Sequence, residues 1–98
     1  MARFDVLETV DGALVVDCQA DFFGFLKTRF VVPLLPPELE PKVADRLNPV
    51  LVIDNEQYVF YTQFAAAMSV AKIRRRVTSV ETHHIEIMDA LDMLISGY

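Results

Sequence analysis

The sequence contains one cysteine, an excess of acidic over basic residues, and no apolar run long enough to cross a membrane. The single thiol, Cys18, cannot form an internal disulfide, which is typical of proteins from a reducing compartment. No apolar stretch approaches the roughly 20 residues of a transmembrane helix. Residues 1–10 also lack the basic start and apolar core of a signal peptide. We therefore expect a cytoplasmic protein without a membrane partner.

The charge balance limits the partners of the chain. Nine Lys and Arg residues stand against 14 Asp and Glu residues, and the formal net charge is −5. A field of this sign does not attract nucleic acid, so we expect no direct nucleic-acid binding. The only basic run is Arg74, Arg75 and Arg76. It is either a solvated loop or a recognition patch for an acidic peptide, because arginine forms strong bidentate pairs with carboxylates.

Catalytic motifs are also missing. The sequence has no glycine-rich phosphate loop, no zinc-ligand spacing and no serine nucleophile elbow. His83 and His84 are adjacent, so on a helix their side chains diverge by roughly 100° and cannot chelate one ion. Cys18 lies in an apolar segment, where an inert buried thiol is the default. We expect neither catalysis nor a bound metal or cofactor.

The length of 98 residues suits one domain over residues 1–98. The hydrophobic fraction of 53% is high for a monomer of this size. Part of the apolar surface is therefore expected in a subunit interface, most simply that of a two-fold homodimer.

Short strand patterns fill most of the chain before residue 80. Segments 3–9 and 13–18 flank the turn pair Asp11-Gly12 and predict a β-hairpin whose second strand is buried on both faces. Pro33 cannot donate to a ladder, which predicts an edge position or a strand end there. Further strands are expected at 28–34, 49–53, 57–64 and 69–73. The connections should be a helical turn at 42–47, a hairpin turn at 54–56 and a break at 65–67.

Residues 80–98 have the pattern of an amphipathic helix. Apolar residues recur at helical spacing and predict one buried face. Thr82 is the predicted N-cap, Gly97 the predicted C-terminal stop, and Asp89 should face water or a partner. The predicted apolar stripe consists of Ile87, Met88, Leu91, Leu94 and Ile95. Several short strands followed by one helix predict an α+β fold, a small β-barrel with the helix packed against it.

The segment at 21–25 has three phenylalanines around Gly24 and does not alternate like a strand. Two interpretations fit it. The rings of Phe22, Phe23 and Phe25 either fold back over the barrel, or form an exposed contact site of the kind found at interface centres.

Four stretches carry a resemblance to a known family. They are VVDCQADFF at 15–23, RFVVPL at 29–34, RLNPVLVIDNEQYVF at 46–60 and DALDMLISGY at 89–98. In this order and spacing they resemble the CcdB toxins of bacterial type II toxin–antitoxin modules. The resemblance implies an SH3-like barrel with an added antiparallel sheet and one C-terminal α-helix, assembled as a homodimer. It also implies binding to the DNA gyrase A subunit, trapping of the cleaved-DNA complex, and neutralisation by a cognate antitoxin.

The resemblance also implies where the target binds. The apolar pair of an early loop corresponds to Phe22 and Phe23. The remaining target-binding positions are in the helix and at its end, at Asp92, Ile95, Ser96, Gly97 and Tyr98. Ser96 stands where the type member has tryptophan, and Asp92 stands where the family has a neutral amide.

Antitoxin binding is expected at Arg74, Arg75 and Arg76. Two other functions remain open. One is a non-toxic CcdB-like paralogue that only binds antitoxin, which Ser96 favours. The other is an endoribonuclease of the MazF type, suggested by barrel analogy and the arginine run.

Overall fold

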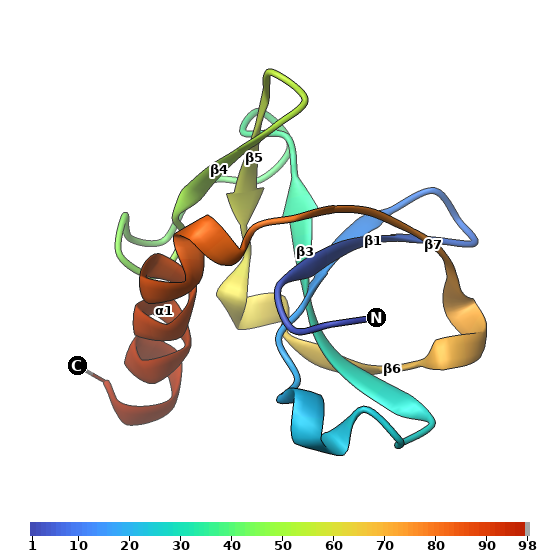
Figure 1. Cartoon of the computed structure of the whole chain (residues 1–98). Helices are drawn as coiled ribbons and strands as arrows, with labels where there is room; N and C mark the ends of the chain where they lie inside the picture. Colours follow the sequence, from blue (N-terminus) through green and yellow to red (C-terminus); the bar gives the residue numbers. More distant parts are fainter. Residues whose placement is uncertain (98) are drawn as a thin grey trace.

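The computed structural model of the chain describes residues 1–97, and Tyr98 lies outside the described residues. Within residues 1–97, seven strands form one antiparallel sheet in the order β4-β5-β3-β2-β1-β7, with β6 paired to β3 beside this path. The strands are β1 (Asp5–Thr9), β2 (Leu14–Asp17), β3 (Thr28–Leu35), β4 (Val50–Ile53), β5 (Glu56–Phe60), β6 (Ala66–Ser69) and β7 (Ile73–Ser79). Figure 1 shows the sheet curled into a partial barrel, with the helix α1 (His84–Ser96) against one side. The predicted α+β fold is confirmed.

The two predicted hairpins are present. Gly12 has a φ of 85° in the turn between β1 and β2. Asp54 and Asn55 have φ values of 52° and 66°, and Ile53 pairs with Glu56 across them. Two consecutive positive φ angles define a type I′ turn, which matches the twist of the flanking strands.

Pro33 lies inside β3, so the expected strand end or edge at this residue is wrong. In an antiparallel ladder the N–H and C=O of one residue point to the same side of the strand. The carbonyl of Pro33 accepts the backbone N–H of Tyr61 at 3.1 Å. Its nitrogen therefore faces the place where the neighbour of β3 changes from β6, paired up to Val31, to β5, paired from Leu34. The missing N–H removes no ladder hydrogen bond.

The boundaries after β5 differ from the prediction. β5 ends at Phe60, and Thr62–Phe64 form a 3₁₀ turn rather than the end of a strand. The hydroxyl of Thr62 donates to the Leu47 carbonyl at 2.5 Å, which turns the chain out of the ladder. The predicted break at 65–67 contains the start of β6, and most of the predicted strand at 69–73 is a second 3₁₀ turn. The helical turn predicted at 42–47 is present as one turn. Its hydrogen bond runs from the Asn48 N–H to the Ala44 carbonyl at 2.9 Å.

The core has two parts. The smaller one lies among the curled strands and consists of Leu7, Val15 and Val31, with Met68 and Ile73 packed against it. The larger one joins the other sheet face to α1 and includes Val16, Phe60, Ile87 and Leu91. Val15 and Val16 belong to different parts, which confirms that the second strand is buried on both faces.

The helix α1 buries a shorter stripe than predicted. Ile87, Ala90 and Leu91 are buried, but Leu94 and Ile95 are exposed because the last turn of the helix extends past the core. The helix begins at His84 without a side-chain cap, since Thr82 lies in a preceding 3₁₀ turn. Gly97 ends it as predicted, with a φ of 79° and its N–H on the Met93 carbonyl at 2.8 Å.

Asp89 on α1 does not point freely to water. Its two carboxylate oxygens accept from Nε and one terminal nitrogen of Arg46 at 2.7 and 2.8 Å. This hydrogen bonding holds the pKa of Asp89 below its usual value and raises the pKa of Arg46. The pair fastens the connection between β3 and β4 to the helix. Of the helical segments within residues 1–97, none has the length and apolar content needed to cross a bilayer.

Cys18 should be unreactive in the folded protein. Burial raises the pKa of its thiol from 9.0 to about 12, and the adjacent Asp17 carboxylate adds to this effect. The pKa of the thiol is higher in the folded chain than in the unfolded chain. The protonated thiol therefore contributes fully to folding stability below about pH 9, and this contribution is lost as the pH rises toward 12. We expect no labelling by a thiol-specific disulfide reagent at pH 8 until denaturant is added. The Cys18→Ala variant should lose stability less steeply above pH 9, and fast labelling of the folded chain would contradict the prediction.

Candidate binding surface

The segment 20–27, here called the aromatic loop, exposes most of its rings. Asp21–Phe23 form a 3₁₀ turn, and the side chains of Phe22, Phe23 and Phe25 are 81%, 47% and 76% exposed. The rings contact one another instead of the core. Phe22 and Phe23 meet edge to face with their centroids 5.1 Å apart, and Phe23 lies 6.4 Å from Phe25. The interpretation in which these rings fold back over the barrel is therefore wrong.

Hydrogen bonds hold the backbone of the aromatic loop on both sides of Phe22. The carboxylate of Asp21 accepts the backbone N–H of Arg3 at 2.8 Å. The side-chain amide of Gln19 donates to the Phe23 carbonyl at 2.8 Å and accepts the Phe30 N–H at 2.9 Å. These bonds fix the backbone that carries the exposed rings.

A buried ion pair lies beneath the loop. Arg29 on β3 donates from Nε and one terminal nitrogen to the same carboxylate oxygen of Asp17 on β2, at 2.9 and 2.5 Å. The two side chains are only 1% and 0% exposed. A Cβ added to Gly24 would lie 3.5 Å from an Arg29 nitrogen and 3.1 Å from the Asp21 carbonyl oxygen. The loop backbone thus rests against the guanidinium of Arg29.

The second predicted element, the end of α1, is also at the surface. Asp92, Ile95, Ser96 and Gly97 are exposed, Ile95 to 77%. Asp92, Ile95 and Ser96 are three and four residues apart and share one face of the helix. Tyr98, also predicted here, lies outside the described residues.

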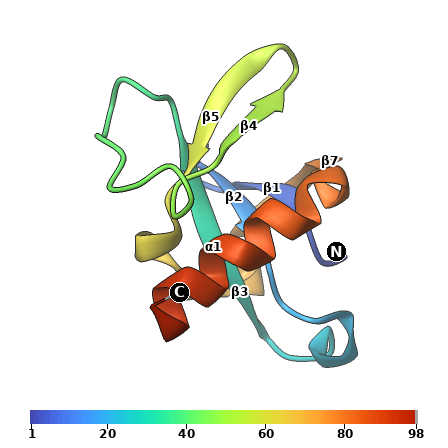
Figure 2. The same cartoon turned by 90° about the vertical axis from the view of Figure 1, so that its left-hand side faces the viewer.

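The structure does not join the two elements into one patch within a single chain. Figures 1 and 2 both show the aromatic loop and the C-terminal end of α1 well apart along the lower edge of the molecule. Arg3 links the loop to the middle of the helix instead. Its backbone N–H binds Asp21, and its guanidinium donates to the sulfur of Met88 at 2.8 Å.

Comparison with known protein families identifies the chain. A family model described as "CcdB protein" matches residues 3–97, which include the aromatic loop, the arginine run and the helix up to Gly97. The chain belongs to the CcdB family. This supports its assignment as a CcdB-type toxin of a toxin–antitoxin module. No curated protein matches the sequence.

In this CcdB-family protein the three arginines lie on β7, an edge strand, and not on a solvated loop. Arg75 pairs with Glu8 at 2.9 Å and Arg76 pairs with Asp5 at 3.0 Å, both across to β1. The side chain of Arg74 makes no ion pair or hydrogen bond with the rest of residues 1–97. Two of the three charges are therefore balanced within the chain. Charged residues on an edge strand also prevent pairing with other strands.

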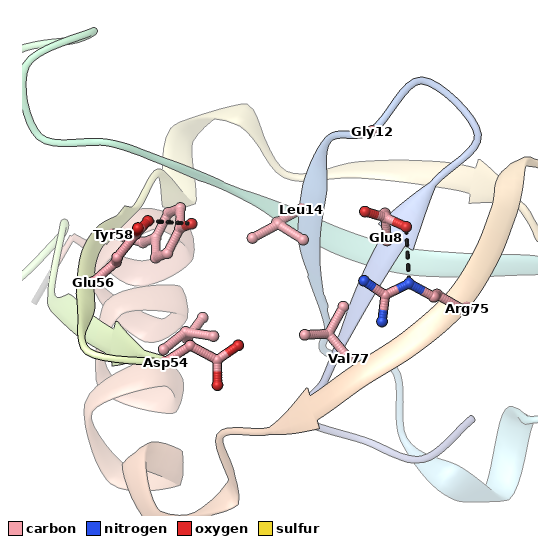
Figure 3. Close-up of a pocket in the computed structure, with 9 residues that line it drawn as sticks. Glu8, Gly12, Leu14, Asp54, Glu56, Tyr58, Arg75 and Val77 are labelled. Carbon is pink, nitrogen blue, oxygen red and sulfur yellow. Dashed lines mark hydrogen bonds and ion pairs between the residues drawn. The ribbon is translucent and has the colours of Figure 1, made fainter.

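A pocket of about 340 Å³ lies next to Arg75, between the β4–β5 hairpin and strands β1, β2 and β7. Figure 3 shows Asp54, Glu56 and Tyr58 of the hairpin facing Glu8 and Arg75. Burial, together with the hydrogen bond from its hydroxyl to Glu56, raises the pKa of Tyr58. Carboxylates outnumber Arg75, which already binds Glu8, so the pocket does not suit an anion. No cluster of three or more potential metal ligands occurs within residues 1–97.

Sequence reasoning missed several residues of this surface. The sequence places Phe25 in the possible contact site but not among the target-binding residues, yet its ring is almost as exposed as that of Phe22. Gln19 and the Asp17–Arg29 pair were not predicted to support the loop. The sequence signal for Asp17 and Gln19 is the motif Val-Asp-x-Gln-x-Asp at 16–21, in which each polar residue makes at least one of the contacts above.

Proposed function

We propose that this protein is a CcdB-type toxin that binds the A subunit of DNA gyrase, traps the cleaved-DNA complex and is neutralised by a cognate antitoxin. The observation that carries the proposal is the aromatic loop, in which Phe22 is 81% exposed and hydrogen bonds hold the residues on both sides of it. Exposed rings on a rigid support are suited to the centre of a protein interface, where aromatic residues contribute most of the binding energy. The protein acts in this proposal by binding, without a catalytic step.

The second part of the target surface is the end of α1. Ile95 offers an apolar side chain, and Ser96, Gly97 and Tyr98 follow it without the tryptophan of the type member. A homodimer would present each loop and each helix end twice. The exposed Val52 on the edge strand β4 and the exposed Leu94 on α1 are apolar surface that a second copy can cover.

Antitoxin binding is proposed at Arg74, Arg75 and Arg76. Arg74 provides a positive charge that no carboxylate within residues 1–97 balances. Arg75 and Arg76 can contribute only if an acidic antitoxin segment competes with Glu8 and Asp5. We therefore assign most of the electrostatic attraction to Arg74.

Expression in a gyrase-sensitive host tests this function. We expect growth arrest and accumulation of cleaved gyrase–DNA complexes with the wild-type chain. Phe22→Ser should weaken the effect about 30-fold in dose, because loss of an interface aromatic costs about 2 kcal/mol or more. Leu39→Ser, which changes a similarly exposed apolar residue in the β3–β4 connection, should leave it intact. Tight antitoxin binding without growth arrest or cleaved complexes would favour the non-toxic paralogue, which the serine at position 96 makes the second candidate.

A further inference from the structure

The side chain of Gln19 completes the ladder between β2 and β3. Asp17 pairs with Val31, so Cys18 lies opposite Phe30, and the Cys18 N–H donates to the Phe30 carbonyl at 2.8 Å. The N–H of Phe30 is accepted by the side-chain oxygen of Gln19 at 2.9 Å. The amide nitrogen of the same side chain donates to the Phe23 carbonyl at 2.8 Å. One side chain thus connects the end of the sheet to the turn that carries the exposed rings.

A primary amide suits this double contact at neutral pH, because it combines a strong donor and a strong acceptor in one neutral planar group. Gln19 is also fixed from behind, since its own backbone N–H donates to the Asp17 carboxylate at 3.0 Å and Arg29 holds that carboxylate. The buried ion pair therefore holds Gln19 in place, and the side-chain amide of Gln19 in turn restrains the loop backbone at Phe23.

We propose that Gln19 is a positioning residue for target binding, which holds the aromatic loop in the conformation that exposes Phe22. This inference rests on the proposed function and adds to it. The carbonyl that Gln19 binds belongs to Phe23, directly after Phe22, and it also accepts the Leu26 N–H at 3.1 Å. Exposed apolar rings gain by collapsing onto the nearest surface, and the backbone restraint opposes this collapse. A loop ordered before binding avoids the entropy cost of being ordered by the target.

The test measures the affinity for the DNA gyrase A subunit. Gln19→Met keeps the length of the side chain and removes both hydrogen bonds. We expect it to weaken binding by about 10- to 100-fold, but by less than about threefold when Phe22 is already alanine, because residues that act as a unit are not additive. The matched control is Gln63→Met, which removes the hydrogen bond that Asn48 donates to another half-buried glutamine at 2.7 Å. The control should bind within about threefold of the wild-type chain. Wild-type affinity of Gln19→Met, or losses that multiply in the double variant, would overturn the proposal.

A glutamate at this position gives a second readout. Gln19→Glu keeps an acceptor for the Phe30 N–H but places a carboxylate oxygen against the Phe23 carbonyl. Binding should be weakened at pH 7 and partly regained near pH 4–5, where the protonated acid again donates. Gln19→Met should show no such recovery. Equal pH profiles for the two variants would contradict the positioning role.

Amide hydrogen exchange in the free protein separates this inference from the proposed function. Gln19→Met should speed exchange of the Phe30 amide at least tenfold, while Gln63→Met leaves it unchanged. If the wild-type chain does not bind gyrase, the proposed target is wrong, and the exchange measurement still decides what Gln19 does. Faster exchange supports its hold on the loop, and unchanged exchange overturns it.

Discussion

Replacing Arg29 by methionine should lower the free energy of unfolding by about 3–5 kcal/mol, as expected when one partner of a buried ion pair is removed. The carboxylate of Asp17 is 0% exposed, and among residues 1–97 it would keep only the Gln19 backbone N–H as a hydrogen-bond donor. A small domain has a total stability of about 5–15 kcal/mol, so the variant should be near its threshold. Urea denaturation at neutral pH measures the effect, with an unchanged m value showing that two-state unfolding is kept.

Two control variants identify the cause of this loss. The double variant Arg29→Met with Asp17→Leu should be more stable than Arg29→Met alone, because it leaves no unpaired charge in the core. Arg46→Met breaks the Arg46–Asp89 pair, which has similar distances but is exposed to solvent, and should change stability far less. If Arg29→Met and Arg46→Met have the same small effect, the buried pair is not the support described above.

The hairpins and the helix could be predicted from local patterns because local chemistry specifies them. Asp54-Asn55 tolerates positive φ, and alternating apolar residues flank each turn. The ends of the strands depend on distant partners. β5 stops at Phe60 because Thr62 binds Leu47, which lies 15 residues earlier in the chain. Pro33 is accepted inside β3 because the neighbouring strand changes beside it. Neither partner is visible in a local sequence pattern.

The binding surface could be predicted only in part, for the same reason. Resemblance pointed to Phe22 and Phe23, but local sequence did not decide between buried and exposed rings. The local sequence does not show that Arg29 is buried in an ion pair, because its partner Asp17 lies 12 residues earlier. The sequence predicts that the charge on Arg75 is available to bind a partner, whereas Glu8, 67 residues earlier, already balances it. Contacts between residues far apart in sequence decide each of these cases.

Deleting residues 96–98 should weaken gyrase binding by more than about 100-fold, to the point where it is no longer detected, and leave the fold intact. The buried residues of α1 end at Leu91, and both Ser96 and Gly97 are exposed. Of the described residues, the deletion removes the exposed Ser96 and Gly97, together with the capping hydrogen bond from the Gly97 N–H to the Met93 carbonyl. Antitoxin affinity should stay within about tenfold, or ~1.4 kcal/mol, of the wild-type value, because the three arginines lie on β7 and not on α1. Titration of both partners against the truncated chain, with circular dichroism as the folding control, measures this.

Arg74→Glu should have the opposite effect. It reverses a charge without breaking the pairs of Arg75 and Arg76, so the sheet should remain folded. Antitoxin binding should weaken by about tenfold or more, and the wild-type affinity should fall with added salt, since the attraction at Arg74 is between exposed charges. Gyrase binding should not change, because the aromatic loop and the end of α1 are untouched. If the truncated chain unfolds, or if either variant loses both partners together, the two surfaces are not separate and the division of roles between them is wrong.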